Sequence, residues 1–428
     1  MPADVAVMED DMKALWFHLM PYQDLPDDFK EKHPSVWVSI DRQLFDSVRG
    51  HQLYNEYLDE LEFASECGFD AICVNEHHSN AYGLMPSPNI IAGALARSTK
   101  DTALCVLGNS VALYNPPTRV AEEMAMIDCI SGGRLIAGFP VGTPMDTCYA
   151  YGQNPDLLRP RYYEAIDLIT KAWESDQPFS FNGRFNQQRY VNAWPRPLQS
   201  PRPPVWIPGS GSVEAWDMCA HRDFVYCYLS YFGWQASAGV MKGFWNRMKE
   251  LKMEPNPFRA GFLQFVGVGE TRAEAEKLYA EAASYFYNRC FHVDPSYASP
   301  PGYTTAETVR AKLGSQVQEG AAKSIRPSRD FSNTKFFDEG HVIVGSPDEV
   351  AAKLREVMVE LNVGNVLMLL HFGNMSRELT RYNTELFSKR VLPQIKDVFE
   401  DQWEHKWWPK PMAREQWRAP VRMAAAAQ

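Results

Sequence analysis

Short apolar runs alternate with longer amphipathic segments along almost the whole chain. Eight of the runs are rich in Val, Ile, Leu and Phe and have the length of buried strands: 14–19, 71–75, 103–108, 134–139, 204–208, 224–229, 260–269 and 365–370. Runs of this kind are typical of parallel strands that helices cover on both sides. The pattern therefore predicts repeated βα units around a parallel sheet.

The segments between the runs have helical periodicity and recognisable ends. Leu53, Tyr57, Leu61 and Ala64 recur at about one-turn spacing, and Gly68 follows them as a helix stop. Eight βα units in 428 residues favour a closed barrel over an open doubly wound sheet. No GxGxxG motif follows the first strand, so a dinucleotide-binding start is not supported. We expect an α/β protein with the (βα)8 TIM-barrel fold.

Three connections are longer than a barrel requires. We expect a single domain over 1–428, with insertions at 20–50, 176–203 and 291–340 and a C-terminal extension over 401–428. The third insertion has few evenly spaced apolar residues and contains the turn-prone ASPPGY and the charged KSIRPSRD. It is our candidate for a mobile lid, and a rigid dimer arm is the alternative.

Composition narrows the class of protein without identifying a function. The formal net charge is −10 and the basic residues are scattered among acidic ones, which argues against a nucleic-acid or anionic-membrane partner. The start, MPADVAVMEDDMK, lacks the features of a secretory signal, and no later stretch is apolar for long enough to cross a bilayer, so we expect a cytoplasmic protein. The eight cysteines form no CxxC pair, which is typical of free, buried thiols.

Histidines stand where several predicted strands end, and functional groups in β/α barrels project from the carboxyl ends of the strands. The second strand is followed by Glu76, His77 and His78. Alternate side chains of an extended segment point in opposite directions, so one histidine is expected to face the site and the other to pack behind it. A partly buried, hydrogen-bonded pair is the other interpretation. His18 and His371 end the first and eighth strands, but without an HxH pair no metal site is expected.

Two small polar segments at strand ends are candidates for ligand contact. Asn109 and Ser110 follow the third strand and could approach a ligand through the backbone, or could simply turn the chain. After the fifth strand, residues 209–212 (Gly-Ser-Gly-Ser) lead into a helix. Exposed amides at a helix start favour a phosphate group, although a Ser-Gly run before a helix is equally a plain N-cap.

At these residues the sequence resembles the bacterial-luciferase-like flavin-dependent monooxygenases, over about residues 13 to 400. Four blocks carry the resemblance: GFDAICVNEHHSNAYGLMPSPNIIAGALA, LCVLGNSVALYNPPTRVAEEMAMIDCISGGRLIAGFPVG, WPRPLQSPRPPVWIPGSGS and VIVGSPDEVAAKL. The second block is long and ordered enough to make chance similarity improbable. In this family the fold is a TIM barrel and the cofactor is FMN.

The resemblance assigns roles to particular residues. His77 matches the catalytic histidine, which lies against the flavin and stabilises its peroxide. Asn109 and Ser110 match a pair whose peptide bond is often cis in the family, beside the flavin. The loop that holds the FMN phosphate corresponds to four residues, Gly209, Ser210, Gly211 and Ser212.

Two departures from the family pattern affect the chemistry. Where bacterial luciferase has a reactive cysteine and a phosphate-binding arginine, this chain has Pro140 and Val141, so light emission is not expected. Arg161 is our candidate for the missing arginine. The substrate pocket is expected to include Tyr82, Trp37 and His18, within aromatic-rich loops that provide an apolar lining.

The resemblance implies a two-component monooxygenase. FMNH2 would come from a separate NAD(P)H:flavin reductase, O2 would be the co-substrate, and a small apolar organic molecule would be oxidised through a flavin peroxide, with a homodimer as the expected assembly. Three alternatives stay open: a deazaflavin-dependent dehydrogenase on the same barrel, a non-catalytic barrel subunit and, less favoured, a metal-dependent barrel hydrolase. The sequence does not identify the substrate.

Overall fold

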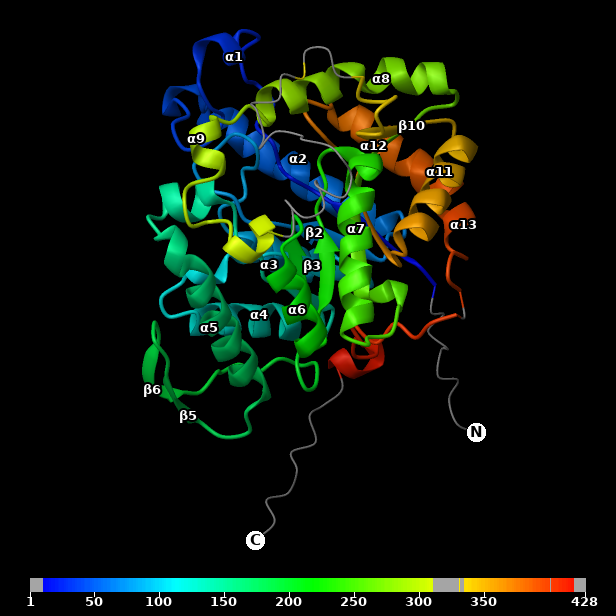
Figure 1. The fold of residues 1–428 in the computed structure, drawn as a ribbon. Coiled ribbons are helices and arrows are strands. Elements are labelled where there is room, and N and C mark those ends of the chain that lie inside the picture. Colours follow the sequence, from blue (N-terminus) through cyan, green and yellow to red (C-terminus); the bar gives the residue numbers. More distant parts are fainter. Residues whose placement is uncertain (1–10, 311–330, 332–334, 401, 419–428) are drawn as a thin grey trace, which may run out of the picture.

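Eight parallel strands form a closed barrel at the centre of the molecule (Figure 1). The computed structural model describes residues 11–310, 331, 335–400 and 402–418. The barrel strands are β1 (Lys13–Phe17), β2 (Ala71–Val74), β3 (Ala103–Leu107), β4 (Leu135–Gly138), β7 (Val205–Gly209), β8 (Val225–Tyr228), β9 (Ala260–Val268) and β11 (Asn365–Leu369). Neighbouring strands pair in parallel, and the pairing of β8 with β9 closes the ring. The predicted fold and all eight predicted strands are confirmed.

Helices surround the barrel, and the longer ones bury their apolar faces against it (Figure 1). They are α1 (Phe29–Lys32), α2 (Ser47–Glu66), α3 (Pro88–Ser98), α4 (Thr118–Ser131), α5 (Pro155–Glu174), α6 (Val213–Arg222), α7 (Gly233–Glu250), α8 (Arg272–Tyr285), α9 (Pro295–Ala298), α11 (Pro347–Leu361), α12 (Arg377–Leu386) and α13 (Leu392–Ile395). The predicted apolar stripe of α2 is buried. Gly68 follows that helix with a φ of +85°, a conformation that glycine adopts without strain.

Sequence reasoning missed a ninth parallel strand, β10 (Val342–Gly345). It pairs with the second half of β9, from Phe265 to Val268, while the first half of β9 pairs with β8 and β11. Because β9 has nine residues, it is long enough to pair with all three strands. The extra strand therefore lies beside the barrel and leaves its eight-stranded closure intact.

The segment 176–203 contains an antiparallel hairpin, β5 (Phe179–Asn182) and β6 (Gln187–Val191), which projects from the lower left of Figure 1. Glu164 of α5 holds its turn, since its carboxylate accepts hydrogen bonds from the backbone N–H groups of Arg184, Phe185 and Asn186 at 2.6–3.1 Å. This insertion is thus tied to the barrel through α5.

The candidate lid at 291–340 falls partly outside the described residues, which omit 311–330 and 332–334. Its described part contacts the loop after β4 and the start of α6. Tyr303 donates a hydrogen bond to the carbonyl of Gly142 at 2.5 Å, and Thr308 donates one to Glu214 at 2.8 Å. Phe331 is buried against aromatic neighbours, including Tyr287. These contacts place the described part over the end of the barrel where the site is expected.

Residues that follow α13 close the opposite end of the barrel. His405 stacks on Phe258, with ring centroids 4.4 Å apart, and its Nε2 lies 2.8 Å from Oδ1 of Asn365, the first residue of β11. Trp407 donates a hydrogen bond to the carbonyl of Asp223, just before β8, at 3.1 Å. Because these partners lie at the amino ends of the strands, this part of the chain forms the floor of the barrel.

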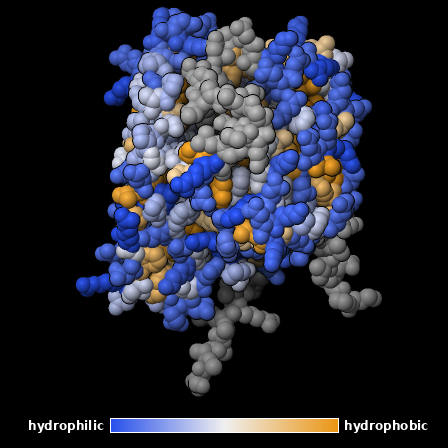
Figure 2. Space-filling view, in the orientation of Figure 1, coloured by the Kyte–Doolittle hydropathy of each residue, from blue (hydrophilic) through white to orange (hydrophobic). Residues whose placement is uncertain are grey.

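The face shown in Figure 2 is mainly hydrophilic, with hydrophobic residues in small separate groups. Within the described residues, no helix is both long enough and apolar enough to cross a membrane. All eight cysteines are free; five are buried, but Cys129 is exposed, contrary to the expectation for buried thiols.

Candidate functional site

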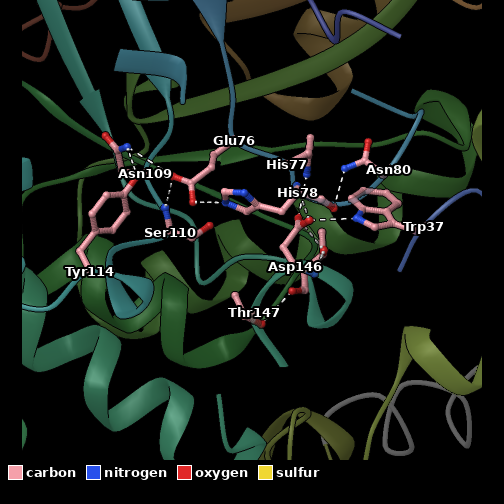
Figure 3. A network of polar contacts seen from close by, with 11 residues as sticks. Trp37, Glu76, His77, His78, Asn80, Asn109, Ser110, Tyr114, Asp146 and Thr147 are labelled. Atoms are coloured by element: carbon pink, nitrogen blue, oxygen red, sulfur yellow. Dashed lines mark hydrogen bonds and ion pairs between the residues drawn. The ribbon is translucent and has the colours of Figure 1, made fainter. Parts of the chain in front are cut away.

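Three of the predicted site residues, His77, Asn109 and Ser110, lie together at the carboxyl ends of β2 and β3, beside the segment that follows β4 (Figure 3). His77 and His78 follow β2, Asn109 and Ser110 follow β3, and Asp146 lies in a π-helical segment (Met145–Ala150) after β4. Adjacent strands of a barrel end at the same rim, which explains how residues nearly 70 positions apart come into hydrogen-bond contact.

His77 is held by the buried carboxylate of Asp146. The His77 Nδ1 to Asp146 Oδ2 distance is 2.9 Å, and Thr143 Oγ1 donates to the same oxygen at 2.9 Å. The other oxygen, Oδ1, accepts hydrogen bonds from the backbone N–H of His78 at 2.7 Å and from Trp37 Nε1 at 2.9 Å. Asp146 is 1% exposed, so these four hydrogen bonds replace the water that its charge would otherwise need.

His78 points to a different carboxylate, as the alternation of side chains predicts (Figure 3). Its Nε2 lies 2.8 Å from Glu76 Oε1, while Glu76 Oε2 accepts hydrogen bonds from Tyr114 Oη at 2.9 Å and from the backbone N–H of Ser110 at 3.2 Å. Asn109 Nδ2 donates to Glu76 Oε2 at 3.3 Å. Burial raises the pKa of Tyr114, and the neighbouring Glu76 raises it further. This network fixes the loop after β3 against the end of β2.

A non-proline cis peptide bond occurs in this loop, between Leu107 and Gly108. We expected it between Asn109 and Ser110, so its position in the sequence was wrong by two residues. A side chain at position 108 would collide with the carbonyl of Gly138 in β4, which explains why glycine stands there.

Aromatic rings flank His77 on two sides. Trp37 and Tyr82 stack with ring centroids 4.7 Å apart, and each meets the His77 ring edge-on at 5.0 Å. Both aromatic side chains are buried, and Tyr82 also contacts Tyr231 and Phe291. The side chain of His77 itself is 13% exposed, and its Nε2 hydrogen-bonds no described residue. The Nε2 edge of the His77 ring is therefore available to a ligand, beside the apolar rings of Trp37 and Tyr82.

His18 lies deeper than the substrate pocket in which we expected it. It is fully buried; its Nδ1 accepts a hydrogen bond from the backbone N–H of Met20 at 2.9 Å, and its Nε2 lies 3.1 Å from Glu60 Oε2. The same carboxylate oxygen lies 2.8 Å from His371 Nδ1. With both ring nitrogens engaged by protein, His18 has no polar atom left for a substrate.

His18, Glu60 and His371 have the composition of a metal site, with ligand atoms within 4.8 Å of one another. However, the Met20 N–H occupies the lone pair of His18 Nδ1, so the proton of the neutral ring must be on Nε2. That proton points to Glu60, where a metal ion would require a lone pair. Hydrogen bonding explains this cluster better than metal ligation does.

The cluster makes the free energy of unfolding depend on pH. Burial lowers the pKa of His18 despite the hydrogen bond to Glu60; burial opposes the charge on Glu60, but the two histidines lower its pKa overall. As the pH falls below 6.5, unfolded His18 binds a proton that the folded protein excludes, so stability should decrease. Below pH 4.5, unfolded Glu60 also binds a proton that the folded protein excludes until the pH reaches about 2, which should decrease stability further.

Urea unfolding measured between about pH 7.5 and pH 5 checks this expectation. His405 contributes in the same direction, because burial lowers its pKa as well. On unfolding, the His18→Gln variant should therefore take up close to one proton fewer than the native protein does. Its stability should still depend on pH, because His405 remains. An unchanged pH dependence in this variant would contradict the proposed protonation of His18.

The Gly209–Ser212 segment is a strand-to-helix turn at the start of α6. Gly211 has a φ of +94°, and Ser212 Oγ accepts a hydrogen bond from the backbone N–H of Ala215 at 3.4 Å, which caps the helix. Ser210 is exposed. The N-cap interpretation is thus correct for Ser212, while the turn and the following helix start retain the geometry that favours an anion.

An arginine lies near this turn, but it is Arg159 and not Arg161. Arg161 points to the hairpin and stacks on Phe185, its Cζ 4.7 Å from the ring centroid. Burial raises the pKa of Glu214, in the first turn of α6, but hydrogen bonds from Thr305 and Thr308 and the nearby positive charge of Arg159 lower it overall. Positions 159 and 161 of a helix lie about 200° apart, so only one can face α6.

The guanidinium of Arg159 lacks a full set of partners. Its Nε and Nη1 atoms are buried and have no hydrogen-bond partner among the described residues. Buried donors of a charged group are rarely left unpaired, because each costs about 1–3 kcal/mol. An anion at the start of α6 would supply the acceptors.

Sequence reasoning therefore missed three functional or structural groups: Asp146, Arg159 and Glu60. Arg159 stood in the run RPRYY from which Arg161 was chosen, so helical phase was the signal that could have separated the two. Asp146 follows β4 by eight residues, and Glu60 lies within α2, where no motif marks either. Only their burial beside histidines identifies them.

Comparisons with known proteins agree with this geometry. A model of the luciferase-like monooxygenase family matches residues 36–364. The oxygenase component of flavin-dependent trigonelline monooxygenase from Acinetobacter baylyi is 32% identical over 182 residues, which are 40% of this chain and 48% of that protein. A 2,5-diketocamphane 1,2-monooxygenase from Pseudomonas putida is 23% identical over 364 residues, 81% of this chain and 94% of that protein.

Solved structures share the fold. The oxygenating constituent of 3,6-diketocamphane monooxygenase from P. putida, in complex with FMN, has a TM-score of 0.66 at 18% identity and covers 90% of this chain and 99% of that one. EDTA monooxygenase from Chelativorans sp. BNC1 has a TM-score of 0.60 at 17% identity, covering 91% and 95%. The matches to the first curated relatives span about half of their lengths, from 44% to 48%.

Proposed function

Because the chain belongs to the luciferase-like monooxygenase family, we propose that it is the oxygenase of a two-component system that uses reduced FMN and O2 to oxidise a small apolar organic substrate. The observation that carries the proposal is the incompletely paired guanidinium of Arg159 beside the start of α6. An FMN phosphate matches that environment in charge and in hydrogen-bonding capacity.

The residues present are compatible with FMN. The phosphate would bind to the Gly209–Ser212 turn, and Arg159 would neutralise its charge. His77 and the loop at Asn109 and Ser110 lie at neighbouring strand ends, where the flavin ring would be held. When bound, reduced FMN supplies the electrons that activate O2, and one oxygen atom enters the substrate while the other leaves as water.

The chain's own residues orient a proton-exchanging group and exclude water from the reacting groups. His77 presents Nε2 as its one free polar atom and can exchange a proton there. Trp37 and Tyr82 form a buried aromatic wall beside it, which limits the access of water to the reacting groups. The same wall is suited to an apolar or aromatic substrate.

We propose that a separate NAD(P)H:flavin reductase supplies FMNH2. The relatives support this arrangement, since one is named as an oxygenase component and another as an oxygenating constituent. No GxGxxG segment for a pyridine nucleotide follows the first strand of this chain.

The proposal is tested by oxygen consumption with enzymatically reduced FMN and a panel of long aldehydes, terpenoid ketones, alkanes and nitrogen heterocycles. Substrate-dependent incorporation of ¹⁸O from O2 into a product is the expected result. Oxidation of a secondary alcohol with reduction of a deazaflavin, and no reaction with FMNH2, would identify a dehydrogenase instead. FMN binding without turnover of any compound would favour a non-catalytic subunit.

We propose a homodimer in solution, as the resemblance implies. Light scattering during size-exclusion chromatography should give about twice the 48.7 kDa mass of the chain. A mass equal to that of one chain at micromolar concentration would contradict this proposal.

A further inference from the structure

The hydrogen bonds around Asp146 determine which nitrogen of His77 carries the proton. We infer that Asp146 is a positioning residue, which holds the neutral His77 ring with its proton on Nδ1 and leaves Nε2 as a proton acceptor toward the bound ligand. The protonation pattern stands on the geometry of the chain alone. Its consequence for catalysis rests on the proposed function.

The carboxylate of Asp146 has four hydrogen-bond partners. Trp37 Nε1 and the backbone nitrogen of His78 are obligate donors, and both reach Oδ1. Oδ2 is shared by Thr143 Oγ1 and His77 Nδ1, each at 2.9 Å. A carboxylate carries no proton, so the short contact with His77 requires the proton to be on Nδ1. A neutral imidazole has only one such proton, and Nε2 is therefore bare.

This arrangement allows His77 to accept and return a proton. When Nε2 takes a proton from the ligand, the ring becomes an imidazolium with a proton on each nitrogen, and Asp146 stays ionised and stabilises the new charge. When Nε2 returns the proton, the ring is neutral again with Nδ1 still protonated. Both exchanges take place at Nε2, so the hydrogen bond to Asp146 is kept throughout.

The Asp146→Asn substitution should reverse the tautomer without removing the side chain. The amide oxygen of the new residue must lie at the Oδ1 position, because both Trp37 and His78 donate there. Its NH2 group then faces His77, where it can only donate. Nδ1 must become the acceptor, and the ring proton moves to Nε2, which is the wrong form for taking a proton from a ligand.

Nitrogen-15 NMR of histidine-labelled, flavin-free protein tests the inference directly, with the His77 signals assigned by their loss in His77→Gln. We expect the Nδ1–H tautomer in the native protein and the Nε2–H tautomer in Asp146→Asn. Thr143→Val is the matched control, since it removes a neutral donor to the same oxygen and should leave the Nδ1–H tautomer in place. Nε2–H in the native protein, or no change of tautomer in folded Asp146→Asn, would overturn the inference.

A second measurement connects the tautomer to the chemistry. The reoxidation of photoreduced FMN by O2 can be followed by absorbance across a pH series, with native protein, Asp146→Asn and His77→Ala. We expect Asp146→Asn to change the pH dependence in the same direction as His77→Ala, with FMN affinity altered by less than about threefold. If His77→Ala has no effect but the tautomer changes as expected, the proposed function fails and the assignment of the proton stands. If His77→Ala has an effect and Asp146→Asn has none, the positioning role fails.

Discussion

Replacement of His77 by alanine is expected to lower coupled product formation by a factor on the order of a hundred or more. His77 presents a free polar ring edge beside the aromatic rings of Trp37 and Tyr82, and we expect none of its described neighbours to replace it in proton exchange. FMN affinity should change little, because the phosphate contacts that we propose lie elsewhere, at the start of α6. Steady-state product analysis and a flavin titration measure the two effects separately.

The control for this experiment is His221→Ala. His221 is an exposed histidine near the end of α6, where it contacts the carbonyl of Asp217. The His221→Ala variant should leave both product formation and FMN affinity at native levels. Full activity of His77→Ala, or activity that depends on added zinc or iron, would show that His77 does not act on the flavin reaction.

Replacement of Arg159 by methionine is expected to weaken FMN binding by about 10- to 100-fold. Hydrogen bonds to a charged group contribute about 1.5–3 kcal/mol, and each 1.4 kcal/mol corresponds to a factor of ten in affinity. Methionine keeps most of the length of the arginine stem, so packing beside Tyr303 should be disturbed little. Fluorescence titration with FMN measures the change.

Two controls isolate the phosphate contact. Riboflavin, which lacks the phosphate, should bind equally to native protein and to Arg159→Met. Arg161→Met should bind FMN as native protein does, because Arg161 stacks on the hairpin. A loss of affinity in Arg161→Met with none in Arg159→Met would restore the assignment that the sequence alone favoured.

Gly211 is a less suitable probe of the phosphate site, although it lies in the loop. A Cβ atom there would come within 2.8 Å of Val240 Cγ1, and the residue's φ is +94°. Any larger residue would therefore strain the backbone and collide with the Val240 side chain of α7. Weaker FMN binding in such a variant would report that strain as well as the loss of phosphate contacts.

The strand pattern was predictable because strands buried on both faces leave uninterrupted apolar runs in the sequence. The strand β10 was missed because it is short and lies within VIVGSPDEVAAKL, a block that we used only for the family resemblance. The hairpin β5–β6 was missed because its residues are mostly exposed and its turn is held by Glu164, a residue of another element. Tertiary contacts of this kind leave no local signal.

The site was predictable only where backbone direction decides the outcome. Alternation after β2 correctly separated His77 from His78, since neighbouring side chains of an extended chain must diverge. The depth of His18 and the orientation of Arg159 depend on packing against other elements, and a linear sequence does not contain that information. Asp146 could not be predicted for the same reason.

The barrel floor has a consequence for synthesis of the chain. His405 and Trp407 cover the amino ends of β8, β9 and β11, strands that begin at residues 225, 260 and 365. A nascent chain can therefore pair all eight strands while the underside of the barrel still faces water. The exposed surface would include the indole of Trp206 in β7, where that strand pairs with β4. Chaperones that bind exposed aromatic surface would find their target during this interval.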